Sequence, residues 1–191
     1  MLGVKAGDDT SFELLLQRYR TPLIHFLSRM VRDVALAEDL AQEVFLRVYR
    51  ARRGYAPSAK FTTWLFRIAT NLALNALRDA RHQRQEISLD APLERQDGAP
   101  VAIDVPDGQP TAVERMVEAD RAAVIRRAIQ ALPEKQRAAV LLHKYHELDY
   151  DEIARVLDCS ESALKSLLFR AYEALRTELA PLVRRAALER K

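Results

Sequence analysis

Hydrophobic side chains recur every three or four residues along most of this chain, the spacing that places them on one face of an α-helix. The clearest example runs from Val34 to Ala51, where four aliphatic residues follow one another at intervals of four: Leu36, Leu40, Val44 and Val48. Strand-like alternation bounded by turn residues is absent, and the chain has only 5 glycines in 191 residues. The pattern therefore predicts an all-α fold.

We expect a four-helix bundle within residues 1–85. Proline suits the first turn of a helix, where the N–H that it lacks would have no partner, so Pro22 is expected to begin a helix capped by Thr21. A turn of basic and small residues, 52–58, separates the last two helices. The helices are expected to begin at Ser11 (or Thr10), Pro22, Val34 and about Lys60, and the last two to end near Ala51 and Arg84.

Residues 149–176 have the pattern of two helices around a tight turn at 158–160. Asp149 can cap the first helix, with Glu152 three residues later to complete a capping box, and Ser160 can cap the second. Apolar residues recur at helical spacing on both: Ile153, Ala154 and Leu157, then Leu164, Leu168, Ala171 and Leu175. This arrangement is typical of a helix-turn-helix, whose second helix can lie in the major groove of DNA.

The net charge of +3 is divided unevenly along the chain. Residues 1–85 carry 14 Lys and Arg against 8 Asp and Glu, residues 86–120 carry 2 against 9, and residues 121–191 carry 14 against 10. The acidic part also holds residues that disfavour helix and strand: Pro92, Gly98, Pro100, Pro106, Gly108 and Pro110. We therefore expect two helical domains, 1–85 and 111–191, joined by an extended acidic linker at 86–110. The simpler alternative is a tether with no role of its own.

Composition narrows the class of protein. Hydrophobic residues make up 49% and charged residues 30%, as in a soluble chain that forms a core. The single Cys159 excludes an internal disulfide and suits a reducing cytosol. Residues 1–9 do not resemble a signal peptide, and no apolar run is long enough to span a bilayer. We expect a cytoplasmic protein without membrane insertion.

Catalytic motifs are absent from the chain. It contains neither a phosphate-binding loop nor a nucleophile elbow, and no pair of acids accompanies a nucleophile. His143 and His146 with Cys159 are candidate metal ligands, but no fourth ligand is evident. We expect neither enzymatic activity nor a metal or other cofactor.

Two segments resemble parts of bacterial RNA polymerase sigma factors of the small extracytoplasmic-function (ECF) class. Residues 37–47, AEDLAQEVFLR, followed by residues 61–71, FTTWLFRIATN, are similar to that family's second region. Residues 132–176, which begin LPEKQR and include the helix-turn-helix, are similar to its fourth region. Order, spacing and linker agree, so the resemblance covers nearly the whole chain. It implies a protein that binds core RNA polymerase and promoter DNA, and that an anti-sigma factor commonly controls.

The resemblance implies that the helix at 34–51 binds a coiled-coil element of the polymerase β′ subunit. Carboxylate and amide oxygens there would accept hydrogen bonds from arginines, and two apolar residues would add contact area. The expected core-binding residues are Asp39, Leu40, Gln42, Glu43 and Phe45. Without the resemblance, the same charges would indicate only the solvated face of an amphipathic helix.

The resemblance also implies that the turn at 52–58 and the following helix open the promoter at the minus-10 element. Aromatic rings can hold an unstacked base, while cations such as Arg52, Arg53 and Arg81 can hold the displaced backbone. The expected contacts are Tyr55, Lys60, Phe61, Trp64, Arg67, Asn71, Asn75 and Arg78. Because an aromatic residue at a helix start often belongs to the core, we expect Trp64 to be mainly buried, with Tyr55 and Lys60 nearer the DNA.

The minus-35 element is expected to contact the second helix of the helix-turn-helix, with Arg137 and Lys144 on the preceding helix contacting phosphates. Asp158 stands where the family usually has Gly, and Asp tolerates a left-handed conformation. Ala163 stands in place of a common Thr. Leu167 replaces a common Arg, so this position would meet thymine methyls or another protein. The expected contacts are Ser160, Glu161, Ser162, Lys165, Ser166, Phe169 and Arg170.

Two functions remain open from the sequence: a sigma factor, or a stand-alone helix-turn-helix regulator whose N-terminal bundle senses a ligand or a partner. The second leaves the motif at 39–47 and the acidic linker unexplained. The family's linker passes through the polymerase channel that later carries RNA. Residues 86–110 hold 6 acids against one base, so we hypothesise that they act there as an anionic stand-in for RNA, through Asp97, Asp104 and Asp107.

Overall fold

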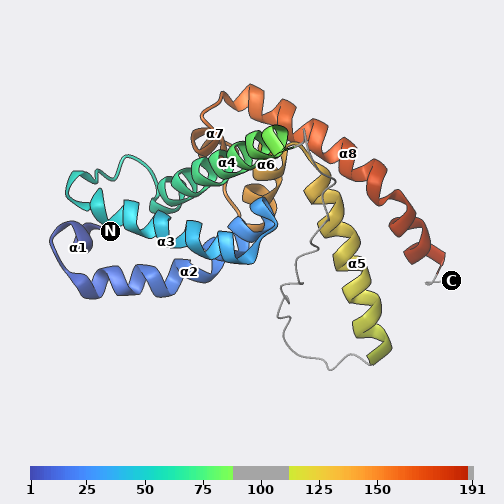
Figure 1. The fold of residues 1–191 in the computed structure, drawn as a ribbon, viewed down its shortest axis with the longest axis horizontal. Helices are drawn as coiled ribbons and strands as arrows, with labels where there is room; N and C mark the ends of the chain where they lie inside the picture. The colour runs from blue at the N-terminus through green and yellow to red at the C-terminus, as the bar shows by residue number, and fades with distance from the viewer. Residues whose placement is uncertain (88–111, 189–191) are drawn as a thin grey trace.

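A computed structural model describes residues 1–87 and 112–188, and every regular element within them is helical (Figure 1). The all-α prediction is confirmed. The linker expected at 86–110 lies outside the described residues apart from its first two positions, so the hypothesis about its charge stays a prediction. The elements are α1 (Leu2–Lys5), α2 (Asp9–Val31), α3 (Val34–Arg50), the 3-10 turn η1 (Arg52–Gly54), α4 (Phe61–Ile87), α5 (Ala112–Ala131), α6 (Glu134–Tyr145), α7 (Tyr150–Leu157) and α8 (Glu161–Leu188).

The two helices expected at Ser11 and Pro22 are one continuous helix, α2, so the predicted break between them is wrong. Asp8 caps α2 by accepting the backbone N–H of Thr10 at 3.1 Å. Pro22 lies inside the helix, which costs about 3 kcal/mol because its ring removes one backbone hydrogen bond. Packing of the following turns offsets this cost, since four large side chains there are fully buried: Leu23, Phe26, Leu27 and Met30.

The predicted third and fourth helices agree closely with α3 and α4. Asp33 caps α3 by accepting the N–H of Leu36 at 3.0 Å. The buried face of α3 is broader than the expected stripe, because α3 packs against both α2 and α4. Leu36 and Leu40 are only half-buried. The buried residues are Ala37, Ala41, Val44, Phe45 and Val48.

The helix-turn-helix prediction is confirmed in its local details. Asp149 and Glu152 form the capping box of α7, with the carboxylate of Asp149 accepting the N–H of Glu152 at 2.8 Å. Asp158 ends α7 in the left-handed conformation, with φ 51° and ψ 56°. Ser160 then caps α8, where its hydroxyl oxygen accepts the N–H of Ala163 at 3.1 Å. All these bonds connect residues within three or four positions, which explains why the pattern revealed them.

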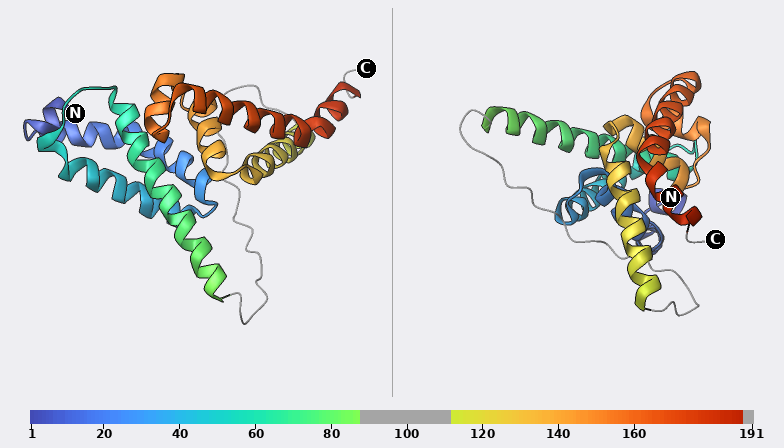
Figure 2. Two further views of the ribbon diagram at one scale, coloured as in Figure 1. Left: turned by 90° about the horizontal axis from the view of Figure 1, so that it is seen from above. Right: turned by 90° about the vertical axis from the view of Figure 1, so that its right-hand side faces the viewer.

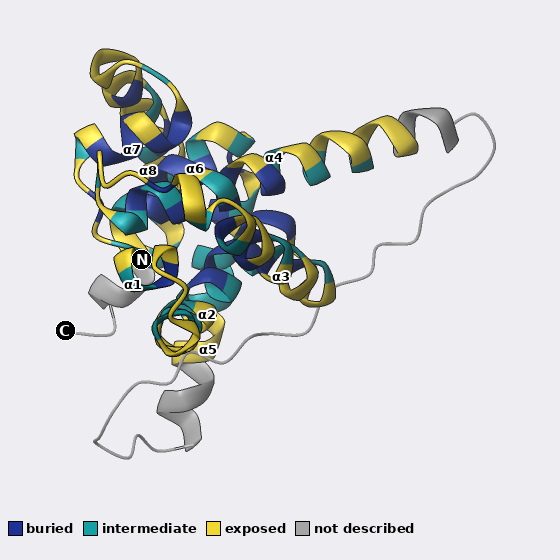
Figure 3. Cartoon of the chain, turned by 90° about the vertical axis from the view of Figure 1, so that its left-hand side faces the viewer, coloured by how far each residue is buried: buried dark blue, intermediate teal, exposed yellow. Residues whose placement is uncertain are grey.

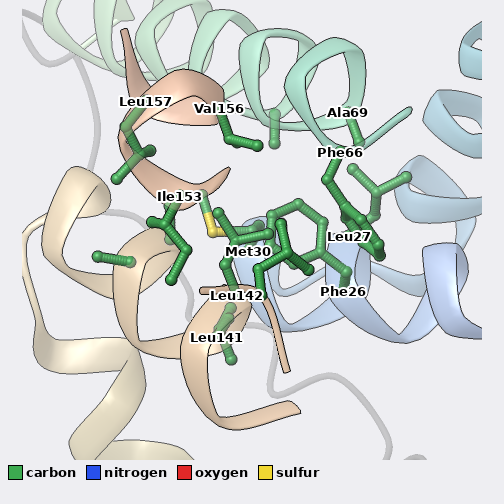
Figure 4. Close-up of a cluster of buried hydrophobic side chains, with 14 of the residues drawn as sticks. Phe26, Leu27, Met30, Phe66, Ala69, Leu141, Leu142, Ile153, Val156 and Leu157 are labelled. Atoms are coloured by element: carbon green, nitrogen blue, oxygen red, sulfur yellow. The ribbon is translucent and has the colours of Figure 1, made fainter. Parts of the chain in front are cut away.

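Buried side chains from both parts of the chain form one hydrophobic cluster (Figure 4). Phe26 and Met30 of α2 and Phe66 of α4 lie beside Leu142 of α6 and Ile153 of α7. Helix α4 contacts α7, and α2 contacts α6. The exposed residues cover the outer faces of these helices (Figure 3). In this structure, the N-terminal helices and the helix-turn-helix therefore share a core.

Arg137 of α6 is buried at this junction, so its expected contact with DNA phosphates is wrong. Its guanidinium donates to the carbonyl of Met30 in α2 at 2.6 Å. The same group donates to the carbonyls of Gln130 at 2.8 Å and Leu132 at 3.1 Å, at the end of α5. One side chain thus satisfies carbonyl groups at the ends of two helices, and the carbonyl of Gln130 also accepts from Arg32.

Helix α5, the second half of α8 and the end of α4 extend away from the shared core (Figure 2). Helices α5 and α8 contact each other near the shared core. Within the two described ranges, no helix is long and apolar enough to cross a bilayer.

Candidate nucleic-acid interface

One side of α3 presents the groups expected to bind a partner protein. Asp39 and Gln42 are exposed, and Glu43 is half-buried. Phe45 is only 6% exposed, so its expected role as an apolar contact is wrong: it packs into the core. The next residue, Leu46, is 48% exposed and lies one turn after Gln42. Sequence reasoning missed Leu46, although its i, i+4 spacing from Gln42 would have indicated it.

Glu43 is oriented by an ion pair within α3. The Nε of Arg47 donates to the carboxylate of Glu43 at 2.7 Å. This hydrogen bond holds the pKa of Glu43 below its ordinary value. The carboxylate is therefore charged at neutral pH. Leu40, the residue after Asp39 on the same helix, is half-buried.

The exposure of the aromatic residues around the start of α4 is the reverse of what we expected from the sequence. Tyr55 is the buried ring, at 9% exposed, whereas Trp64 is only half-buried. The two ring centroids lie 5.2 Å apart, and Phe61 packs edge-on against Trp64 at 6.0 Å. Lys5 of α1 reaches the backbone carbonyl of Tyr55 and Trp64 packs on its ring, so Trp64 is the more accessible of these two aromatic residues. Lys60 is exposed, as expected.

From Arg67 to Arg78, α4 has an exposed polar face. Arg67, Asn71, Asn75 and Arg78 are all exposed and lie at intervals of three or four residues. Such spacing places them on one face of the helix. The Nη2 of Arg78 donates to the side-chain oxygen of Asn75 at 3.0 Å. The structure therefore brings these expected minus-10 contacts into one row.

The start of this row is covered by α7. Lys60 Nζ lies 3.1 Å from the carboxylate of Glu152. Arg67 pairs with Asp158 at 3.6 Å, and the hydroxyl of Thr63 donates to Glu152 at 3.1 Å. Glu152 has a 9% exposed side chain, so its charge is satisfied inside the junction. Sequence reasoning assigned Glu152 only to a helix cap, because its partners lie about ninety residues earlier in the chain.

A cavity of about 970 Å³ opens between the loop and the helix-turn-helix. Trp64 and Arg67 line one side, and Arg155 and Cys159 line the other. Its walls come from both parts of the chain. Any movement of α7 away from α4 would therefore open it further and expose Trp64.

The first turns of α8 present an uninterrupted exposed surface. Lys165 pairs with Glu161 at 2.7 Å, and this hydrogen bond raises the pKa of Lys165. Ser166 donates to the carbonyl of Ser162 at 3.1 Å. Phe169 is 67% exposed, so its ring is accessible to a partner. The expected minus-35 residues are all exposed on this surface: Ser160, Glu161, Ser162, Lys165, Ser166, Phe169 and Arg170.

The histidines at the end of α6, His143 and the C-cap residue His146, are occupied in packing. His146 lies between Phe26, at 5.6 Å between ring centroids, and Phe66, at 4.3 Å. Burial, followed by the charges of Arg29 and His25, lowers the pKa of His146 to about 4. His143 shares a 2.7 Å hydrogen bond with the hydroxyl of Tyr172. In the part of the chain that the structure describes, no three His, Cys, Asp or Glu side chains lie close enough to hold a metal ion.

Comparison with known proteins identifies relatives over most of the chain. Residues 15–83 match the family model of Sigma-70 region 2, and residues 122–175 match Sigma-70, region 4. The RNA polymerase sigma-H factor of Pseudomonas aeruginosa is 35% identical over 186 residues, covering 96% of this chain and 93% of that protein. The ECF RNA polymerase sigma-E factor of Escherichia coli is 33% identical over 186 residues, covering 95% and 93%.

Two solved structures have the same fold. The sigma factor RpoE in complex with the anti-sigma factor NepR, from Bartonella quintana, superposes with a TM-score of 0.68 at 20% identity, covering 89% of this chain and 97% of that one. CnrH in complex with the cytosolic domain of CnrY superposes with a TM-score of 0.65 at 19% identity, covering 93% of each. At such low identity, these two matches support the fold.

Proposed function

The chain belongs to the ECF group of sigma-70 RNA polymerase sigma factors, and we propose that the exposed faces of α3, α4 and α8 make the contacts with polymerase and promoter DNA that such a factor needs. A sigma factor directs core RNA polymerase to selected promoters and starts transcription there. The alternative of a stand-alone regulator would leave the region 2 match at residues 15–83 without a role.

The exposed face of α3 is the main support for this proposal. Asp39, Gln42 and Leu46 are exposed side by side, with the ion-paired Glu43 next to them. Acceptors around an apolar residue suit a partner helix that carries arginines and leucines, since buried apolar contacts contribute most of the binding energy and charges provide specificity. We assign this face to core polymerase.

The remaining surfaces suit promoter DNA. The α4 row of Arg67, Asn71, Asn75 and Arg78, with Lys60 and Trp64 at its start, combines cations with an accessible ring, as separated strands require. The exposed start of α8 suits the minus-35 element, because a helix that begins at a capped N-terminus can enter the major groove. Both partners are found in the bacterial cytoplasm, where we place this protein.

An inhibitory partner is also part of the proposal. The RpoE structure that superposes on this chain was solved with an anti-sigma factor, and CnrH was solved with a cytosolic domain of CnrY. We propose that this chain is held by a comparable partner.

Charge reversal on α3 tests the central assignment. Glu43→Arg combined with Gln42→Ala should weaken core binding by at least ~10-fold, because a new cation would face the arginines of the partner. Glu13→Arg, an equal charge change at an exposed position of α2, serves as the control. Fluorescence anisotropy with labelled chain and purified core enzyme measures the affinity. Equal affinity of the α3 double variant and the control would refute the assignment.

A further inference from the structure

The loop between α3 and α4, residues 51–60, has little internal support. Its backbone hydrogen bonds connect near neighbours only: Gly54 to Ala51 at 3.1 Å, Tyr55 to Arg52 at 3.3 Å and Ser58 to Ala56 at 2.8 Å. Short-range bonds of this kind shape a turn but do not fix it relative to the rest of the molecule. The position of this loop therefore depends on what packs against it.

Helix α1 provides that support at Tyr55. The Nζ of Lys5 donates to the backbone carbonyl of Tyr55 at 2.7 Å, across 50 residues of sequence. The ring of Tyr55 packs on Trp64 at the start of α4, with centroids 5.2 Å apart. Tyr55 is thus held from two sides, by its carbonyl at α1 and by its ring at α4. Residues 56–60, which end at the exposed Lys60, follow directly from this fixed point.

The position of α1 is itself well defined. Val4 is 2% exposed, so α1 is seated in the body of the protein. At Gly3, a Cβ atom would lie 3.0 Å from the Cβ of Ser11 and still closer to its hydroxyl, so only glycine allows α1 to approach α2 this closely. Ser11 is fixed in turn, since its hydroxyl donates to Asp8 at 2.5 Å.

We propose that α1 is a positioning element for promoter reading, in which Lys5 acts through Tyr55 to hold the 55–60 segment and Trp64 where they meet the minus-10 element. This inference rests on the assignment of that loop to DNA in the proposed function. Base capture requires the contacting groups to be held to about 0.5 Å, which the loop's own short-range backbone bonds do not achieve, and the ion pair of Lys60 with Glu152 would be given up to DNA. Lys5 is therefore a positioning residue. The competing role is an ordinary lysine contact to phosphate.

Amide hydrogen exchange on the full chain tests the support directly. Lys5→Met keeps the aliphatic stem but removes the donor, so the hydrogen-bonded amides of Tyr55 and Ser58 should exchange at least ~5-fold faster, while those of α3 and α8 are unchanged. Gly3→Ala, which touches neither Lys5 nor the loop, should have the same effect by displacing α1. Lys5→Arg should restore slow exchange, and Lys135→Met at an exposed position of α6 should leave it unchanged. Unchanged loop exchange in Lys5→Met would overturn the inference, whatever the effect on transcription.

The consequence for DNA is tested with holoenzyme made from the full chain and core polymerase. Permanganate footprinting would compare open complexes on a promoter selected with the wild-type chain and on variants of each minus-10 base. Lys5→Met should lower the preference for the correct base by at least ~5-fold, with core affinity and salt dependence unchanged. An equal loss on all promoters with a shallower salt dependence would make Lys5 a phosphate contact and overturn the inference. A wild-type chain that binds core polymerase but opens no promoter would refute the DNA assignment itself, whereas the exchange measurement would still decide whether α1 holds the loop.

Discussion

Arg137 shows how one side chain can connect segments that are distant in the sequence. Its guanidinium donates to three carbonyls, at Met30, Gln130 and Leu132, the first of them 107 residues away. Arg137→Met should lower the free energy of unfolding by about 3 kcal/mol, because it removes the donor to the buried carbonyls of Met30 and Leu132.

Urea unfolding at constant pH measures this change. Arg127→Met, at an exposed position of α5, is the control and should change the free energy of unfolding by less than about 0.5 kcal/mol. If Arg137→Met folded with wild-type stability but bound DNA with a shallower salt dependence, the phosphate role predicted from the sequence would be restored.

His146 makes stability depend on pH. Its pKa in the folded chain is about 4, so it is neutral there, whereas the unfolded side chain titrates near 6.5. Below pH 6.5, the unfolded chain takes up a proton that the folded chain does not bind, so stability falls as pH decreases from 6.5 to 4 and levels off below. The full effect is about 3 kcal/mol.

His146→Gln should reduce this pH dependence, as measured by urea unfolding at pH 7.5 and pH 5. Burial also lowers the pKa of His25 and of His143, which contribute in the same direction and remain in the variant. Parallel stability curves for the wild-type chain and His146→Gln would show that His146 is not the group responsible.

At the scale of single elements, the α8 surface that we propose for the minus-35 element offers two kinds of side chain for DNA contact. Lys165 is a cation held by Glu161, and Phe169 is an exposed ring one turn later. Lys165→Ala should weaken binding to all minus-35 sequences alike and lower the salt slope by about 1, because one phosphate contact is lost. Phe169→Ala should instead relax the preference at one base pair.

Selection from a randomised minus-35 duplex pool by holoenzyme, repeated at several salt concentrations, distinguishes these outcomes. Arg176→Ala, further along α8 in an ion pair with Glu173, is the control and should alter neither quantity. If no α8 variant changed either quantity, the minus-35 surface would have to lie elsewhere.

In the molecule as a whole, the α4 row that we propose reads the promoter is packed against the helix-turn-helix. Lys60 and Arg67 pair with Glu152 and Asp158 of α7, so DNA would have to displace these carboxylates. Glu152→Gln combined with Asp158→Asn should loosen the junction while preserving the capping box, since Gln can replace Glu there. The two parts should then separate more often, with a larger radius of gyration in solution scattering.

Asp151→Asn is the matched control, because Asp151 pairs within α7 with Arg155 at 2.5 Å. Its radius of gyration should equal that of the wild-type chain. A double variant that stayed as compact as the control would show that apolar packing around Phe26, Phe66 and Ile153 holds the parts together without help from the ion pairs.

Local chemistry explains which features could be predicted. The capping box at Asp149, the left-handed Asp158 and the Ser160 cap all involve residues within a few positions, so their pattern is visible in the sequence. The predicted break at Pro22 failed because packing of α2 against α3 and α4 outweighs the local cost of proline. The prediction that Phe45 is an exposed contact was wrong for a similar reason. Helical periodicity does not indicate how broad the buried face is when a helix, such as α3, packs against two others.

The sequence by itself determined the helical class, the helix-turn-helix and the family, because these depend on periodicity, capping and short motifs, and it supplied the candidate groups for binding polymerase and DNA. Only the tertiary structure decided how those groups are presented. Tyr55 is buried, with Lys5 of α1 bonded to its carbonyl, and Trp64 is more open. Leu46 replaces Phe45 on the α3 face, and Arg137 is inside. Each of these outcomes depends on contacts between residues roughly ten to more than a hundred positions apart. Periodicity and short motifs do not indicate which side chains pack together over such separations.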